Sequence, residues 1–194
     1  MRILGRVVLV LVALALLFCS SCAGSIKQFY QDEYLAEDGV YHNKTIGFSI
    51  LYMGNWHLIT DPADMTGPSL SLARDLNASG AELLYIGATI DATQGTRAIA
   101  VNLNEDPEIY TDSVRSYNRE GIDEEFGVTT MLINDKPMVK WEYRIGEFRF
   151  VEFIFAVRTY NVRIAFWSRP AVYNNFLTVY EEIMATLTQG SSLR

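Results

Sequence analysis

Residues 148–157 read Phe-Arg-Phe-Val-Glu-Phe-Ile-Phe-Ala-Val, and this stretch decides the fold class. Successive side chains of a β-strand point to opposite faces, and in this segment both faces are apolar. The apolar positions are Phe148, Phe150 and Ile154 on one face and Val151, Phe153 and Phe155 on the other. A strand that is covered on both sides belongs in the interior of a sheet, with a further layer on each face. The stretch therefore predicts a three-layer arrangement.

The segments around this strand alternate between strand and helix patterns. Strands are predicted over 40–43, 47–52, 56–59, 82–90, 98–103, 127–133, 138–145 and 162–167, and helices over 70–76, 107–120 and 170–188. The apolar stripe of the middle helix is Ile109, Tyr110, Ser113, Val114 and Tyr117. Clustered strands with intervening helices indicate an α+β domain in which helices flank an antiparallel β-sheet, an α/β/α sandwich.

The strand over 138–145 has one polar, solvent-facing side, here called the wet face. Lys140, Glu142 and Arg144 lie on it and alternate along the strand with apolar residues of the other face. If Gly146-Glu147 forms a two-residue turn, Arg144 lies directly opposite Arg149, and two like charges in that position need a partner. A bound anion or an acidic partner protein would supply it, and so could Glu142 on the diagonal of a merely solvated face. We take Lys140, Glu142, Arg144 and Arg149 as the candidate partner-binding residues.

The N-terminal segment has the pattern of a secretory signal. A basic start precedes the apolar run Val7 to Phe18, whose 12 residues are too few for a bilayer span of about 20. Ser20, Ser21 and Cys22 follow, an order that resembles the bacterial lipoprotein signal, in which the cysteine is diacylated and becomes the new N-terminus. The alternative is an ordinary secretory signal that is cleaved after Ala23 or Gly24. The first interpretation makes Cys22 the site of lipid attachment.

These features divide the chain into four parts. We expect a signal peptide over 1–21, a lipid-anchored tether over 22–38, one folded domain over 39–189 and a tail over 190–194. The protein is then extracytoplasmic and anchored to a membrane through its lipid. An aspartate directly after the lipidated cysteine resembles a signal that retains lipoproteins in the inner membrane, and this chain has Ala23 at that position. If the cell has two membranes, the periplasmic side of the outer membrane is therefore favoured.

Composition excludes several classes of function. The formal net charge of −7 disfavours a nucleic-acid partner. His42 and His57 are the only histidines, and the turn expected at Asp61-Pro62 breaks any metal-ligand spacing after His57. No Gly-rich phosphate loop and no nucleophile elbow is present. We therefore expect no catalytic residues, no metal and no cofactor, and conclude that the protein is not an enzyme.

The segment Gly47-Phe48-Ser49-Ile50, followed by Trp56, resembles the opening of the PsbP-like family, which includes the DcrB-like bacterial envelope proteins. The family closes with a Phe-rich strand pair and an amphipathic helix, much like residues 148–187. This sequence departs from the family at Met53 and Gly54, where a proline is common. The resemblance implies an α/β/α sandwich and a non-enzymatic accessory or assembly role, and it carries over no active-site residues.

Two functions follow from these patterns. The first is a lipid-anchored envelope module that binds a protein partner as a scaffold or accessory subunit. The alternative is a small-ligand-binding lipoprotein with an aromatic pocket between the sheet and the helices. The candidate pocket residues are Trp56, Trp141, Tyr143 and Trp167.

Overall fold

The computed structural model describes residues 26–189. The strands are β1 (Asp32–Leu35), β2 (Val40–Asn43), β3 (Phe48–Leu51), β4 (Trp56–Ile59), β5 (Ala81–Thr89), β6 (Gln94–Val101), β7 (Glu124–Ile133), β8 (Lys136–Ile145), β9 (Phe148–Val157), β10 (Tyr160–Ser168) and β11 (Thr188–Gln189). The helices are α2 (Gly67–Ala78), α3 (Pro107–Asn118), the short 3-10 helix η1 (Arg119–Gly121) and α4 (Pro170–Ala185).

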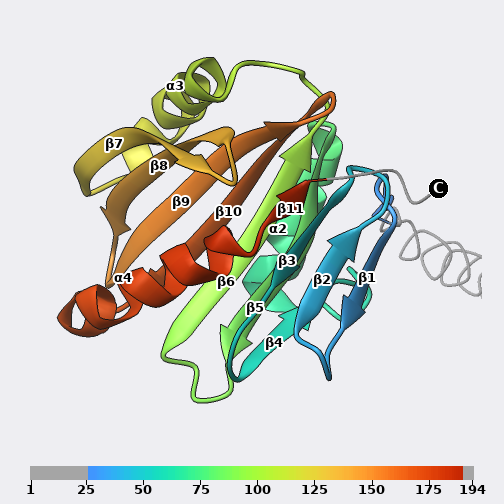
Figure 1. The fold of residues 1–194 in the computed structure, drawn as a ribbon, viewed down its shortest axis with the longest axis horizontal. Helices are drawn as coiled ribbons and strands as arrows, with labels where there is room; N and C mark the ends of the chain where they lie inside the picture. Colours follow the sequence, from blue (N-terminus) through green and yellow to red (C-terminus); the bar gives the residue numbers. More distant parts are fainter. Residues whose placement is uncertain (1–25, 190–194) are drawn as a thin grey trace, which may run out of the picture.

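The strands form two antiparallel sheets. The large sheet has seven strands in the order β4-β5-β6-β10-β9-β8-β7, and the small sheet has four in the order β1-β2-β3-β11. Helix α4 and the small sheet lie in front of the large sheet in Figure 1, and α2 lies behind it. The molecule is therefore an α+β fold of three layers, as the sequence predicts.

The two faces of the large sheet have different covers. On the α4 face, α4 and the small sheet pack on a continuous core that includes Phe153, Phe155 and Phe166. On the α2–α3 face, α3 packs on β8 and β9 through Tyr110 and Val114, whereas α2 packs on β5. We use these two names for the faces throughout.

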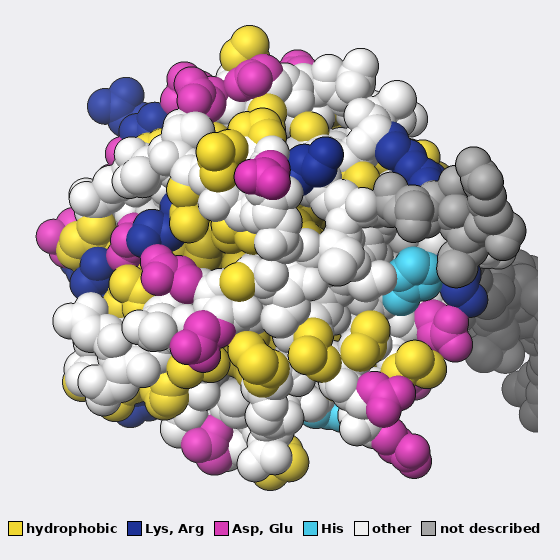
Figure 2. Space-filling view, in the orientation of Figure 1, with side chains coloured by type: hydrophobic (Ala, Val, Ile, Leu, Met, Phe, Trp, Pro, Cys, Tyr) yellow, Lys and Arg dark blue, Asp and Glu magenta, His cyan; other side chains and the backbone are white. Residues whose placement is uncertain are grey.

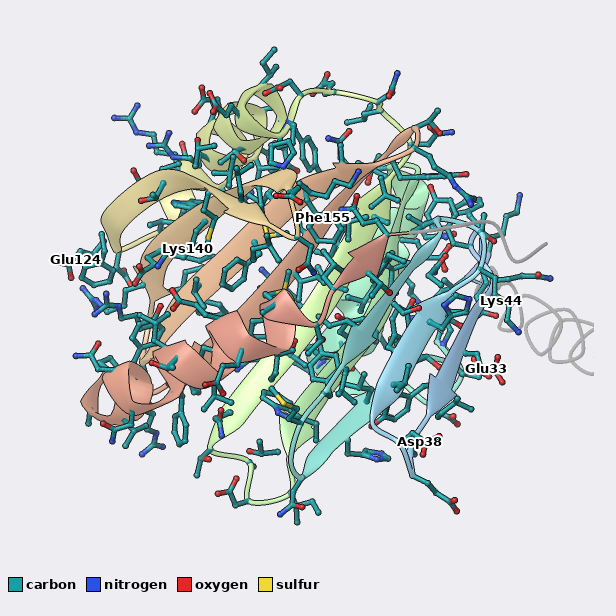
Figure 3. All side chains as sticks on the ribbon, viewed as in Figure 1. Glu33, Asp38, Lys44, Glu124, Lys140 and Phe155 are labelled. Atoms are coloured by element: carbon teal, nitrogen blue, oxygen red, sulfur yellow. The ribbon has the colours of Figure 1, made fainter. Side chains whose placement is uncertain are left out.

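Strand β9 has the position that its sequence predicts. It lies inside the sheet between β10 and β8, and its apolar residues from Val151 to Phe155 are fully buried. Strand β8 is second from the β7 edge, but its wet face is partly covered, because it lies on the side of the sheet that carries α4. Figure 3 shows Phe155 within the layered interior and Lys140 on β8.

Two predictions about the helices are wrong in detail. The stripe of α3 includes neither Ile109, which is 61% exposed, nor Tyr117, which is 90% exposed. Its buried positions are Tyr110, Thr111 and Val114, together with the first residue of the helix. Helix α2 begins at Gly67, three residues before the predicted start at Leu70, since proline is well tolerated in the first turn of a helix and Pro68 lies there.

The folded part begins earlier than the predicted start at Gly39. Strand β1, within the expected tether, pairs with β2, and the backbone N–H groups of Phe29 and Tyr30 donate to the buried carboxylate of Glu82. The predicted signal peptide, Cys22 and the tail over 190–194 lie outside the described residues. Among residues 26–189, no helix has the length and apolar character needed to cross a bilayer.

Candidate functional site

The β8–β9 hairpin brings the predicted cations together. Ile145 pairs with Phe148 across the turn, and Arg144 lies directly opposite Arg149, as the two-residue turn predicts. Gly146 has a φ of +56°, in the left-handed region that glycine adopts without steric cost. The hairpin therefore places two arginines side by side on the α4 face.

Acidic groups on the same face meet most of this charge. Glu142 accepts from Arg149 at 2.9 Å and lies 3.5 Å from the ammonium of Lys140. Lys140 also donates to Glu181 of α4 at 2.9 Å, and Tyr173 of α4 donates to Glu142 at 3.0 Å. Burial lowers the pKa of Lys140, but the hydrogen bond with Glu181 and the charges of Glu181 and Glu142 raise it by a larger amount. The net shift of this pKa is therefore upward. Glu142 thus ties α4 to the sheet.

Arg149 is held between two aromatic rings. Its guanidinium carbon lies 4.1 Å from the ring centre of Phe126 and 4.3 Å from that of Tyr173, a double cation–π arrangement. Burial, and then the charge of Glu142, raise the pKa of the Tyr173 hydroxyl. Arg149 is therefore packed and paired, and it is less available to an outside partner than its sequence position suggests.

Arg144 remains the accessible cation of the set. Its side chain is 36% exposed, and its partners Glu124 and Asp123 lie at 3.4 and 3.9 Å. Large, partly exposed apolar side chains lie at the same end of the hairpin, on both faces of the sheet: Phe126 lies on the α4 face beside Arg149, whereas Ile145 and Phe148 alternate with the two arginines and point to the α2–α3 face. Each of the three is about 40% exposed. Figure 2 shows apolar and charged side chains interleaved at the left of the molecule, and Figure 3 places Glu124 at this outer end. We call Phe126, Arg144, Ile145 and Phe148 the hairpin-end surface.

The four aromatic residues predicted to line a pocket do not line a single one. Trp56 packs on the α4 face against Tyr52 and Phe166, whereas the other three lie on the α2–α3 face. Trp141 and Tyr143 are 1% and 2% exposed, respectively, because α3 covers them. Only Trp167 keeps a partly exposed surface.

The small sheet holds a pair that the sequence analysis missed. His42 and Ser49 are cross-strand neighbours on β2 and β3, with Nδ1 and Oγ 2.5 Å apart. Glu33 lies opposite His42 on β1, but its carboxylate is paired with Lys44 at 2.8 Å. The pair lies on the face of the small sheet opposite its buried residues, and within residues 26–189 no hydrogen bond or ion pair joins Glu33 to the imidazole. The pair therefore lacks the orienting acid that completes the usual nucleophilic triad.

The hairpin-end surface had a partial signal in the sequence. Arg144 and Arg149 follow from the Gly146-Glu147 turn, and the same turn places the neighbouring Ile145 and Phe148 opposite each other. Phe126 was not predictable, because it lies in a bulge of β7 between Glu125 and Gly127 that changes which side chains face outward.

Comparison with known proteins supports the fold. No family model matches the chain, and no curated protein matches it. Among solved structures, cyanobacterial PsbP (CyanoP) from Synechocystis matches with a TM-score of 0.52 and 10% sequence identity, over 88% of this chain and 98% of that chain. The fold is therefore PsbP-like, as the opening motif suggests. At this identity the likeness establishes the fold alone.

Two further structures resemble the chain more weakly. One is from Bacteroides thetaiotaomicron, with a TM-score of 0.44, 15% identity and coverage of 76% of this chain and 46% of that one. The other is a protein of unknown function from Pseudomonas aeruginosa, with a TM-score of 0.47, 9% identity and coverage of 84% and 99%, respectively. Both scores are too low to add to the fold assignment.

Proposed function

We propose that the protein is a non-enzymatic, lipid-anchored module of the cell envelope that binds a protein partner through its hairpin-end surface. The observation that carries the proposal is that Phe126, Ile145 and Phe148, large side chains each about 40% exposed, lie with Arg144 at one end of the hairpin, on the two faces of the sheet. Apolar and aromatic residues beside an arginine are the composition of the energetically dominant part of protein interfaces.

The position of the surface supports the same function. It lies at the β7 end of the large sheet, and β7 is the edge strand, with most of its residues exposed. An edge strand offers unpaired backbone N–H and C=O groups to another chain. Of the predicted partner-binding residues, Arg144 then contacts the partner, while Lys140, Glu142 and Arg149 hold the surface in shape through their ion pairs with one another and with α4.

The anchoring part of the proposal rests on the sequence. A basic start, a short apolar run and Cys22 favour diacylation, and two acyl chains hold a protein stably on a membrane. The PsbP-like fold and a lipoprotein-type N-terminus together favour an extracytoplasmic envelope protein of the DcrB-like kind. Cys22→Ala should move the protein from the membrane fraction to the soluble fraction, and retention in the membrane would contradict the anchor.

Photo-crosslinking in intact cells tests the surface directly. A benzophenone amino acid at position 148 should give one discrete crosslinked product, which Arg144→Glu should abolish. The same group at position 90, where Ile90 is 79% exposed on the β5–β6 connection, is the matched control for exposure. Arg74→Glu, on the exposed side of α2, controls for the charge change. Identical products at positions 148 and 90, or no product at positions 126, 145 and 148, would refute the proposal.

A further inference from the structure

The middle of the α2–α3 face carries charged side chains that the two helices cover only in part. The register places Arg97 of β6 opposite Ala165 of β10, and Ala165 opposite Glu152 of β9. Arg163 and Trp167 lie two positions to either side of Ala165 on the same strand and face. Arg97 and Trp167 remain partly exposed, since α2 packs on β5, and α3 packs on β8 and β9, whereas the Arg163 side chain is only 11% exposed.

Cations outnumber anions in this group. Glu152, whose side chain is 1% exposed, accepts from Arg163 at 2.8 Å and from the hydroxyl of Tyr143 at 3.2 Å. Burial alone would lower the pKa of Arg163, but the Glu152 carboxylate raises it, so this arginine is firmly charged. Glu152 is thus fully used by its neighbours. It leaves the charge of the other arginine without a counterpart.

Arg97 is the unpaired member. Its Nε is buried and has no hydrogen-bond partner, and no carboxylate of residues 26–189 lies within ion-pair distance of its guanidinium. A buried, charged donor without an acceptor is costly, and a bound water, ion or ligand can supply the missing acceptor. The lack of a carboxylate partner for Arg97 is the more unusual because the chain has 23 acidic and only 16 basic residues.

Flat aromatic surface borders the arginines. The ring of Trp167 lies against Gly95, where any Cβ would collide with it. Phe150 lies 5.5 Å from Trp167 between ring centres and is stacked on Tyr143 at 5.1 Å with an angle of 5°. Trp167 and Phe150 are both partly exposed, so this row presents aromatic surface beside Arg97 and Arg163.

We propose that Arg97, Arg163 and Trp167 form a binding site for a small carboxylate that carries a planar ring. The carboxylate accepts from the free guanidinium edge of Arg97, a planar fork that matches two oxygen atoms. Arg163 adds positive charge beside it, while Glu152 keeps Arg163 in place. The ring of the ligand packs on Trp167 and Phe150. This site is independent of the hairpin-end surface and of any protein partner.

Calorimetric titration of the full chain in detergent with benzoate, acetate and inorganic phosphate tests the site. Benzoate should bind most tightly, and Arg97→Gln should weaken it at least tenfold. Trp167→Leu should weaken benzoate but leave acetate unchanged. Arg74→Gln, which removes an exposed arginine of α2, should change nothing. Equal affinity for benzoate and acetate would overturn the aromatic part of the proposal.

A second measurement observes binding in the wild-type chain and uses a variant, Arg97→Lys, only to assign one resonance. In the wild-type chain with 15N-labelled arginine, benzoate should shift one Nε–Hε resonance, which Arg97→Lys removes from the spectrum. A shift of that resonance with saturation supports the site. The absence of any shift with benzoate, or benzoate binding that Arg97→Gln leaves intact, would overturn it.

Discussion

The two faces of the large sheet hold their aromatic residues in different surroundings. On the α4 face, Phe153, Phe155 and Phe166 are fully buried, and the hydroxyls of Tyr52 and Tyr85 pair with each other at 2.6 Å. On the α2–α3 face, aromatic rings lie beside two arginines and one glutamate, and part of the group stays exposed.

The difference follows from what covers each face. Helix α4 and the small sheet cover the whole α4 face, which we call the closed face. Helices α2 and α3 each cover one side of the α2–α3 face and leave its middle strands partly open, so we call it the open face. A closed face gains stability from each apolar side chain that it buries. An open face with fixed charges contributes less, but it can bind a ligand. The large sheet thus has one face that contributes most to the stability of the fold and an opposite face that can bind a ligand.

The largest expected effect is on the closed face. Phe166→Ala should lower the free energy of unfolding by about 4 kcal/mol, because the ring is fully buried and stacks on Tyr180 at 4.9 Å. Phe150→Ala, on the open face, should cost about half as much, since its ring is only partly buried. Urea denaturation of both variants measures the two losses. Equal losses would mean that the two faces do not differ in how tightly they are packed.

The next effect tests the charged group of the open face. Glu152→Ala should cost about 3 kcal/mol, because it leaves Arg163 charged and largely buried without its carboxylate. Removal of both charges, in Glu152→Ala with Arg163→Met, should recover most of that loss. The same denaturation experiment applies. A double variant as unstable as the single one would show that packing, not charge, decides the outcome here.

Gly95 allows the packing of the open face to be tested without a change in charge. Gly95→Ala should cost about 2 kcal/mol, since the new methyl group meets the ring of Trp167 and forces it to move. Gly127→Ala is the matched control, because Gly127 also lies in a strand but has no atom within 4 Å of the position that its methyl group would take. Its effect should stay within about 0.5 kcal/mol. Equal thermal shifts in the two variants would contradict the contact.

Much of the closed face could be predicted from the sequence, and little of the open one. The two-sided apolar pattern of 148–157 and the Gly146-Glu147 turn are local, so they place β9 and its hairpin correctly. Arg97 and Arg163 are single basic residues in otherwise apolar strands that lie far apart in the chain. Only the pairing of β6 with β10 brings them together, and no local pattern reports that pairing.

The errors at α3 and β1 have physical reasons of the same kind. The predicted stripe of α3 favoured Ile109 over Thr111, but the Thr111 hydroxyl donates to Pro107 O at 2.6 Å and so can be buried at little cost. Strand β1 reads as polar, because its pairing with β2 needs only backbone hydrogen bonds at the edge of the small sheet.

The smallest expected effect compares one carboxylate from each face. Glu152 on the open face has an arginine, whereas Glu82, on the face that carries the small sheet, has only the backbone N–H groups of Phe29 and Tyr30. Burial therefore raises the pKa of Glu82 to about 7, although those two hydrogen bonds lower it. The folded chain holds this proton more tightly than the unfolded chain.

Stability should consequently fall as the pH rises from about 4.5 to about 7 and should level off above that range, because only within it is the Glu82 carboxyl protonated in the folded chain and ionised in the unfolded chain. Glu82→Gln removes the titration but keeps an oxygen that accepts from Phe29 and Tyr30. The variant should therefore lose part of the wild-type decline in the free energy of unfolding between about pH 5 and about pH 7.5. Parallel pH profiles for the two proteins would show that Glu82 is solvated and that the segment before β1 does not seal this margin of the closed face.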